Sequence, residues 1–318
     1  MKYILPMKLQ YELISYLTYA FPYSMMNSLD MLQEWLASHY HFACAYINQD
    51  NDINIEYLDG FSYGNFHREN NMIIMSKHAP KKEDIFDYVV NCLSRHEYIV
   101  IFLDEYYRSE SALYQRKHLL HEILIYGCEN DCLLYTAFNN QNKFSLLRMH
   151  RKEINDSYLR GFDIKPTSTS SWIQDRRIMT FSIDYKVEST NEDVPFTKYT
   201  YGGVSNIFNE TKNEYCTMYC GIDNTQLFTK VIQAQKERYH NMIPYAGMHA
   251  LYESKQLIYK WLNRQNDKIA AKYHSDVLGE MNIARMIYIK EAISGKNHWR
   301  QVLSHLSIAY LREKKLLS

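Results

Sequence analysis

Four short stretches decide the fold of this chain: YIVIFL (98–103), LLHEILI (119–125), CLLYTAF (132–138) and KFSLLRM (143–149). Each is an apolar or alternating run of the length that is typical of a strand. The last three are separated only by the turn sequences 127–131 and 139–142. Because strands joined by such short turns must pair antiparallel, the sequence predicts an antiparallel meander over residues 98–149.

Two predicted helices precede this meander. Met25, Leu29, Leu32 and Leu36 are spaced to share one helical face, which predicts a helix over 24–38 with Ser24 as its N-cap. A second amphipathic pattern predicts a helix over 83–93, and the polar segment 41–63 between them reads as strands or loops. Helices on one side of an antiparallel sheet define the α+β class.

The second half of the chain has a different pattern. Residues 161–222 contain two runs rich in Ser, Thr, Asn and Pro around one strand-like piece at 179–185. Helical periodicity then recurs in four segments, at about 223–239, 244–263, 270–291 and 299–315. We therefore predict an α+β domain over 1–160, a linker and mixed segment over 161–222, and a helical region over 223–318.

Composition excludes several classes of function. Lys plus Arg equals Asp plus Glu at 36 each in 318 residues, so a nucleic-acid partner is not expected. The longest apolar runs are too short to span a bilayer, and the N-terminal residues lack a signal-peptide core, so we expect a cytoplasmic protein without a membrane partner. No glycine-rich phosphate loop occurs, and the six cysteines are read as reduced thiols without metal ligation. We expect no cofactor and no metal.

His121 is the strongest candidate for chemistry. It begins an apolar strand, which would hold the ring rigidly at a cleft as a general base requires. Asp104 and Glu105 end the preceding strand, where a carboxylate could orient that imidazole. The alternatives are a hydrogen-bonded core histidine and a solvated strand end paired with Arg108.

These residues also carry a resemblance to a known family. The stretch FLDEYY (102–107), followed by HLLHEILIYG (118–127), a turn and another strand, looks like the N-terminal domain of butirosin biosynthesis protein H. The likeness is sharpest over 99–149, and weaker likeness extends to 21–25, to 199–202 and to the helix containing His249. It implies a papain-like fold and an acyltransferase that moves an acyl group from an acyl carrier protein thioester to an amine.

The resemblance implies a site and also shows a departure from the family. It makes His121 the general base and Asp104 a residue of the cleft, with substrate-binding positions at Tyr23, Glu105, Tyr106, His118 and Asn139. A papain-like enzyme has its nucleophilic cysteine at the start of the first core helix, but Ser24 stands there in this sequence. Cys44 follows the predicted helix, and Asn139 is the one amide offered after the next strand.

Three hypotheses remain open at this point. In the first, Ser24 or Cys44 accepts an acyl group from a carrier-bound thioester with His121 as base, or His121 activates an amine or water that attacks the thioester directly. In the second, the papain-like cleft is catalytically degenerate and binds a carrier protein or a peptide. The third, a cysteine peptidase, lacks the helix-start cysteine.

Overall fold

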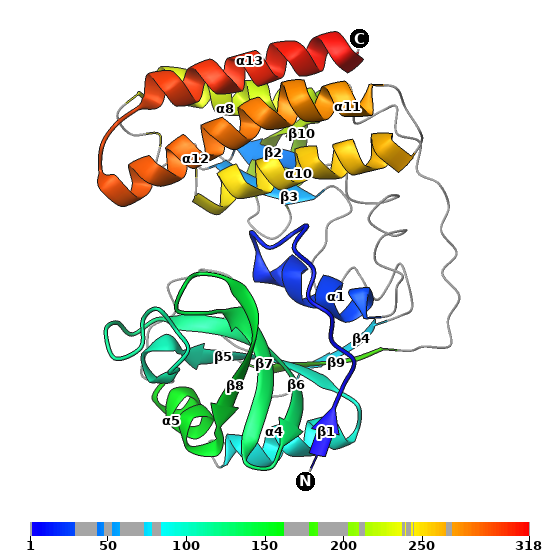
Figure 1. The fold of residues 1–318 in the computed structure, drawn as a ribbon, viewed down its shortest axis with the longest axis vertical. Coiled ribbons are helices and arrows are strands. Elements are labelled where there is room, and N and C mark those ends of the chain that lie inside the picture. The colour runs from blue at the N-terminus through cyan, green and yellow to red at the C-terminus, as the bar shows by residue number, and fades with distance from the viewer. Residues whose placement is uncertain are drawn as a thin grey trace. The chain divides into compact units, whose positions relative to one another are not determined.

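The structure is a computed structural model, and the description covers residues 2–28, 43–47, 53–57, 73–77, 84–161, 178–183, 203–209, 214–236, 239, 243, 245–264 and 269–317. The chain divides into two compact units (Figure 1). Unit 1 consists of Met1–Asp30 and Ser62–Thr190, and unit 2 of Met31–Phe61 and Asn191–Ser318. Each unit is thus built from two separate pieces of sequence.

Unit 1 contains an antiparallel sheet in the order β4-β9-β5-β6-β7-β8, and β1 pairs with β6 beside this path. The strands are β1 (Lys2–Ile4), β4 (Ile73–Lys77), β5 (Tyr98–Asp104), β6 (Leu120–Glu129), β7 (Cys132–Phe138), β8 (Phe144–His150) and β9 (Ile178–Ile183). The four strands β5, β6, β7 and β8 follow one another as the predicted meander.

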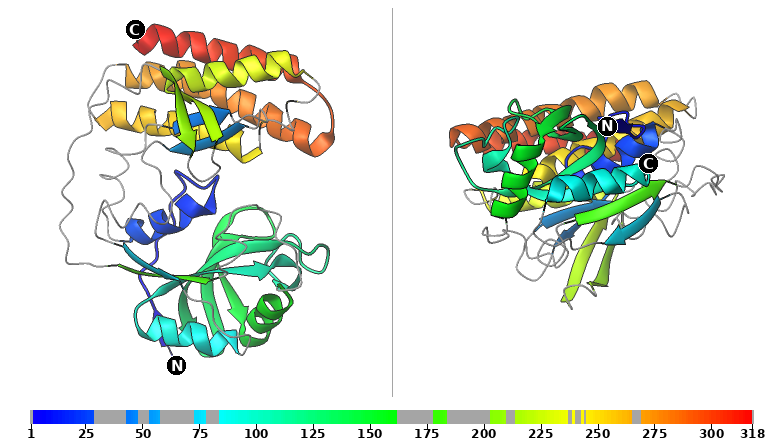
Figure 2. Two further views of the ribbon diagram at one scale, coloured as in Figure 1. Left: turned by 180° about the vertical axis from the view of Figure 1, so that it is seen from behind. Right: turned by 90° about the horizontal axis from the view of Figure 1, so that it is seen from below.

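Helices cover both faces of this sheet. Every residue of β5 is buried, which is why this strand reads as a continuous apolar run. Helices α4 (Ile85–Ser94) and α5 (Arg151–Gly161) lie along one face, and α1 (Leu17–Asn27) lies on the other (Figures 1 and 2). Helix α1 contacts the sheet through Phe21, whose ring centroid is 6.2 Å from that of Phe144.

Asparagines make the two hairpin turns of the meander possible. Asn130 between β6 and β7 has φ 57°, and Asn142 between β7 and β8 has φ 56°. Asparagine tolerates this left-handed region better than most residues. The Asn139 side chain also accepts hydrogen bonds from the backbone N–H groups of Gln141 and Lys143, both at 2.9 Å, which closes the second turn.

Unit 2 is a second α+β body. Its antiparallel sheet has the order β10-β11-β2-β3, formed by β2 (Ala43–Ile47), β3 (Ile53–Tyr57), β10 (Gly203–Asn209) and β11 (Glu214–Cys220). Helices α8 (Ile222–Ala234) and α10 (Tyr245–Arg264) contact the sheet. The short α11 (Ala270–Tyr273) leads through the π-helical turn η2 (His274–Leu278) into α12 (Gly279–Ser294), and α13 (Trp299–Leu317) packs on α8 and α12.

The predicted domain boundaries differ from these two units. Residues 161–222 are not a linker, because β9 joins the sheet of unit 1 and β10 and β11 form half of the sheet of unit 2. The described elements of 223–318 are helical, but they do not form a body of their own, because α8 and α10 pack on a sheet that includes β2 and β3. Pairing between residues about 170 positions apart leaves no local signal in the sequence.

The predicted elements are partly displaced. The first helix runs over 17–27 rather than beginning at Ser24, and residues 29–38 of the prediction lie outside the described residues. Strand β6 continues through the predicted turn at Gly127 to Glu129. Helix α5 was not predicted, because its segment has few apolar residues and buries Ser157 beside Ile154 and Tyr158. Within the described residues, no helix is both long and apolar enough to span a bilayer.

Gly127 permits the close approach of β1 to β6. A Cβ at this position would lie 3.0 Å from the Tyr3 carbonyl oxygen and 3.3 Å from Ile4 Cα. Gly127→Ala should therefore weaken the docking of β1 by about 1–3 kcal/mol. Hydrogen exchange of the Leu5 amide, which donates to the Tyr126 carbonyl at 2.8 Å, should accelerate accordingly.

Gly279→Ala provides the matched control. No atom lies within 4 Å of a Cβ added at Gly279, so this change should stabilise α12 slightly and leave the Leu5 amide as protected as in the wild type. Equal protection of Leu5 in both variants would contradict the steric role of Gly127.

Candidate functional site

His121 is the second residue of β6 and lies opposite Leu103 of β5. Side chains alternate between the two faces of a strand, so His121 shares its face with Leu103 and with the residue two positions beyond, Glu105. Asp104 pairs with Leu120 and belongs to the other face. The register of β5 and β6 therefore selects which of the two adjacent carboxylates reaches the histidine.

A pocket of about 200 Å³ lies beside His121. Its lining comes from the turn after β5, from the start of β6 and from the β7–β8 turn. The lining residues are Glu105, Arg108, Ser111, Ala112, Leu113, Leu119, His121, Phe138, Asn139 and Asn142. All of them fall between residues 105 and 142, so a single continuous stretch of sequence builds the pocket.

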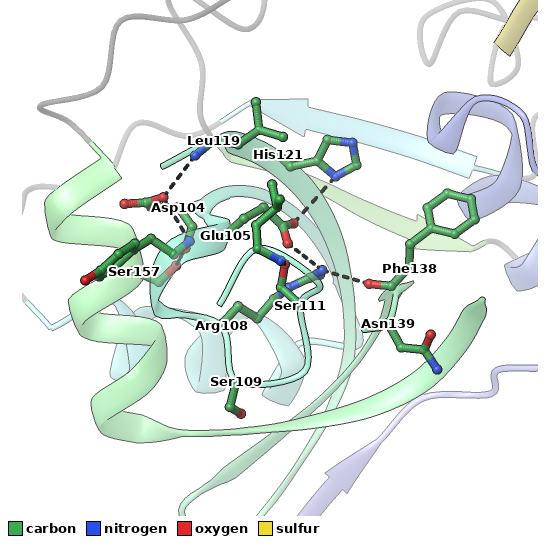
Figure 3. A network of polar contacts seen from close by, with 12 residues as sticks. Asp104, Glu105, Arg108, Ser109, Ser111, Leu119, His121, Phe138, Asn139 and Ser157 are labelled. Carbon is green, nitrogen blue, oxygen red and sulfur yellow. Dashed lines mark hydrogen bonds and ion pairs between the residues drawn. The ribbon is translucent and has the colours of Figure 1, made fainter. Parts of the chain in front are cut away.

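A buried ion pair forms one wall of the pocket. Arg108 Nη2 lies 2.7 Å from Glu105 Oε2 and donates a second hydrogen bond to the Phe138 carbonyl oxygen at 2.8 Å (Figure 3). The Glu105 and Arg108 side chains are only 6% and 3% exposed, so the predicted alternative of a solvated strand end is wrong. The guanidinium carbon lies 5.7 Å from the centre of the Tyr135 ring. Among the described residues, none accepts a hydrogen bond from Arg108 Nε or Nη1.

His121 is held near this ion pair. Its Nδ1 atom lies 3.7 Å from Glu105 Oε1, which is beyond hydrogen-bonding distance, and the side chain is 40% exposed at the pocket (Figure 3). Burial lowers the pKa of the imidazole, the Glu105 carboxylate partly offsets that effect, and the Arg108 guanidinium adds to it. The ring is therefore mainly neutral at pH 7 and able to accept a proton.

Asp104 contacts His118 rather than His121. Its Oδ2 atom lies 2.7 Å from His118 Nδ1, and its Oδ1 atom accepts backbone N–H groups from Tyr106 at 3.1 Å and Leu119 at 3.2 Å. Figure 3 shows Asp104 directed toward Leu119, away from His121. Of the two carboxylates that could orient His121, Asp104 is therefore not the one, and it does not line the pocket as the resemblance implied. Asp104 instead holds both ends of the loop between β5 and β6.

His118 and Tyr106 do not line the His121 pocket. The two rings stack with centroids 4.2 Å apart and an interplanar angle of 17°, and the His118 side chain is 55% exposed. Tyr106 belongs to the short 3₁₀ helix η1 (Glu105–Tyr107), which Asp104 caps. Tyr106 and His118 therefore stack on each other at the surface of the β5–β6 loop, outside the pocket that they were predicted to line.

Asn139 lies at the pocket, as the prediction of a binding residue requires, but its side chain is committed to the β7–β8 turn. Besides accepting the two turn N–H groups, its Nδ2 atom donates to Ser145 Oγ at 3.2 Å. The amide of Asn139 thus rigidifies the rim of the pocket. The carboxylate that approaches His121 is that of Glu105, the first residue of η1 directly after β5.

Neither Ser24 nor Tyr23 lines the pocket. Both are fully buried in the second half of α1, and Ser24 Oγ donates to the Ala20 carbonyl oxygen at 2.8 Å, one helical turn back. Ser24 is therefore not an N-cap, because the helix begins at Leu17 with Tyr16 as the preceding cap residue. Ser24 therefore does not stand at the start of the helix, where a papain-like enzyme has its nucleophile.

Cys44 belongs to unit 2, where it lies on β2 opposite Glu56 of β3 and Cys220 of β11. Its side chain is outside the described part of the structure. The predicted strand location of Cys44 agrees with β2. Its proposed role as a nucleophile stays a prediction.

Sequence reasoning missed Ser111 and Phe138 as pocket residues. Ser111 is 4% exposed, accepts the Leu113 N–H at 3.0 Å, and carries the one hydroxyl or thiol among the residues that line the pocket. The polar loop 105–119 offers no periodicity from which this position could be inferred. The strongest available signal was its place in the chain between Glu105 and His121.

No model of a known protein family matches this sequence, and no curated protein matches it either. Among the described residues, no group of three or more His, Cys, Asp or Glu side chains is placed to hold a metal ion. The pocket is therefore interpreted from its own geometry.

The first prediction from this geometry concerns the proton affinity of His121. Glu105→Gln removes the one charge that raises the pKa of this histidine, so the pKa should fall further below its ordinary value. A titration of the His121 ring protons by NMR measures the change. Glu129→Gln, at the other end of β6, is the matched control and should leave the His121 titration nearly unchanged. An unshifted pKa in folded Glu105→Gln would contradict the proposed electrostatics.

The second prediction separates Asp104 from its histidine partner. Asp104→Ala leaves two backbone N–H groups of the loop without their acceptor, which should cost about 1–3 kcal/mol for each buried group left unpaired. His118→Ala removes only a half-exposed ring and should cost less than about 1 kcal/mol. Urea unfolding compares the two variants, and equal losses of stability would show that Asp104 contributes through its contact with His118 rather than by holding the loop.

Proposed function

We propose that unit 1 is a papain-like domain related to butirosin biosynthesis protein H, and that its His121 pocket transfers an acyl group from a carrier-bound thioester to an amine or water in the cytoplasm. Two observations support this proposal. Every residue of the pocket lies within the stretch 99–149 that carries the resemblance, and a mainly neutral histidine faces the pocket beside a buried cation. The observation that carries most weight is the access of the His121 ring to the pocket.

In the proposed reaction, His121 acts as a general base and no protein nucleophile takes part. The imidazole removes a proton from the bound amine or water, which attacks the thioester carbonyl carbon. A C–N or C–O bond forms, the C–S bond breaks, and the proton passes from His121 to the departing thiolate. Thioesters are reactive enough for direct attack, and the absence of a phosphate loop in the sequence requires an acyl donor that is already activated.

The Glu105–Arg108 pair would supply the electrostatic part of this reaction. Negative charge develops on the carbonyl oxygen during attack, and a buried cation stabilises such charge more strongly than an exposed one. Arg108 is fixed by Glu105 and by the Phe138 carbonyl, so it needs no reorganisation at the moment of reaction. We assign Arg108 to oxyanion stabilisation and Glu105 to positioning Arg108 and tuning His121.

The position of Ser24 favours direct attack over an acyl-enzyme formed on this residue. The Ser24 hydroxyl is fully buried and already donates to Ala20. The same observation supports the alternative that the pocket is catalytically degenerate and binds a carrier protein or a peptide without turnover. Both proposals use the same pocket, so they are separated by activity rather than by binding.

The experiment measures release of free thiol from acyl carrier protein thioesters and pantetheine thioesters, with a panel of amines as acceptors. Wild type should turn over faster than His121→Ala by about 10²–10⁴-fold, since this is what a positioned general base contributes. His96→Asn is the matched control: His96 is exposed after α4 with φ 62°, a conformation that asparagine accepts, and should retain wild-type turnover.

Three outcomes would change the assignment. An acyl adduct on Ser111, detected by mass spectrometry, would replace direct attack with a serine mechanism. An acyl adduct on Cys44 would restore the cysteine nucleophile. Equal binding of carrier protein by wild type and His121→Ala, with no turnover of any donor, would establish the non-catalytic alternative.

A further inference from the structure

A cysteine and a histidine meet at the other end of the unit 1 meander. Cys132 is the first residue of β7 and His150 the last residue of β8, and the two are direct cross-strand partners. The Cys132 Sγ atom lies 3.2 Å from His150 Nδ1. This distance allows the imidazole to accept the thiol proton.

Cys132 is the most accessible of the cysteines whose side chains the structure describes. Cys92, Cys128 and Cys216 are buried, whereas Cys132 is partly exposed and His150 is exposed. Burial raises the pKa of the Cys92 and Cys128 thiols, which makes them less reactive. Unit 1 thus offers a partly exposed thiol at Cys132 and buried thiols at Cys92 and Cys128 for comparison.

The pair is distant from the His121 pocket. His121 lies near the start of β6, and Cys132 pairs with Glu129 at the end of the same strand. Eight residues of strand span roughly 25 Å. The two histidines cannot act on the same small group, so the Cys132–His150 pair needs its own chemical interpretation.

An open groove of about 680 Å³ is lined in part by His150, and Asp131, the residue before Cys132, lines it as well. It includes His150 and carries charges of both signs. The lining residues are Asp131, His150, Arg151, Lys152, Asn155 and Asp156. The Arg151 guanidinium donates hydrogen bonds to Asp84 and Asp87 at the start of α4. The other charged residues that line the groove are Lys152, Asp131 and Asp156, and these would contact a ligand first.

We propose that Cys132 is a nucleophilic thiol that undergoes thiol–disulfide exchange with small disulfides carrying both amino and carboxylate groups, with His150 as its base. His150 takes the thiol proton, Cys132 sulfur bonds to one sulfur of the disulfide, and the S–S bond breaks. The departing thiolate receives the proton from His150, so the products are a mixed disulfide on Cys132 and one small thiol.

The mixed charges of the groove motivate the zwitterionic class of disulfide. Lys152 can attract a carboxylate, and Asp131 or Asp156 can attract an ammonium group. A disulfide without charges would gain neither contact. The proposal is independent of acyl transfer at His121, because it uses a different thiol, a different base and a different pocket.

The experiment incubates the full chain with oxidised glutathione and, separately, with uncharged 2-hydroxyethyl disulfide near pH 7, and maps the adducts by mass spectrometry. Cys132 should form the mixed disulfide before Cys92, Cys128 or Cys216. His150→Asn should slow the reaction of Cys132 about tenfold or more, whereas His96→Asn should not. Oxidised glutathione should react faster than the neutral disulfide, and Lys152→Gln with Asp156→Asn should remove that preference.

Two results would overturn the proposal. If Cys132 reacts at the same rate in His150→Asn as in the wild type, with both proteins folded, the histidine is not its base and Cys132 is only an exposed thiol. If both disulfides react at equal rates relative to a short peptide that contains the same cysteine, the groove does not select a zwitterionic partner.

Discussion

The register between β5 and β6 is the constraint on which the proposed chemistry depends. Because side chains alternate along a strand, a shift of one residue would turn His121 to the other face and exchange Glu105 for Asp104 as its neighbour. The observed pairing of Leu103 with His121 is stabilised on both sides, since β6 is also paired with β7 and is locked into a sheet whose central residues are buried. The hydrophobic core thereby determines the electrostatic environment of the histidine.

The buried Glu105–Arg108 pair is a second constraint, and it links parts of the sheet that pairing alone does not connect. Removing two charges from water is costly, and the hydrogen bond from Arg108 Nη2 to the Phe138 carbonyl oxygen offsets part of that cost, although Nε and Nη1 have no acceptor among the described residues. Arg108 joins the turn after β5 to the last residue of β7 through the Phe138 carbonyl. Glu105 and Arg108 thus line the pocket and keep a cation near His121. Two apolar side chains at these positions could line the pocket but would supply no charge.

Local signals predicted the meander and the strand position of His121, because alternation and turn residues are properties of neighbouring positions. The same reasoning could not choose between Asp104 and Glu105, since both are adjacent in sequence and only the register separates them. It also divided the chain incorrectly, because β2 and β11 pair across most of the chain. Ser24 was wrongly predicted to be a helix N-cap for a related reason. The apolar residues that follow it have helical spacing, but that spacing does not show that the helix already begins seven residues earlier, at Leu17.

A papain-like enzyme combines a thiol and an imidazole at one site, so that labelling the thiol and losing activity are the same event. In unit 1 the proposed base, His121, lies near the start of β6, whereas the partly exposed Cys132 thiol begins β7 beside the far end of β6. A thiol reagent that modifies Cys132 should therefore leave a reaction based on His121 intact, and protonation of His121 should not alter the thiol. If unit 1 descends from a papain-like ancestor, the histidine and the reactive thiol are no longer at one site. Acyl transfer at His121 and thiol reactivity at Cys132 then have to be measured separately.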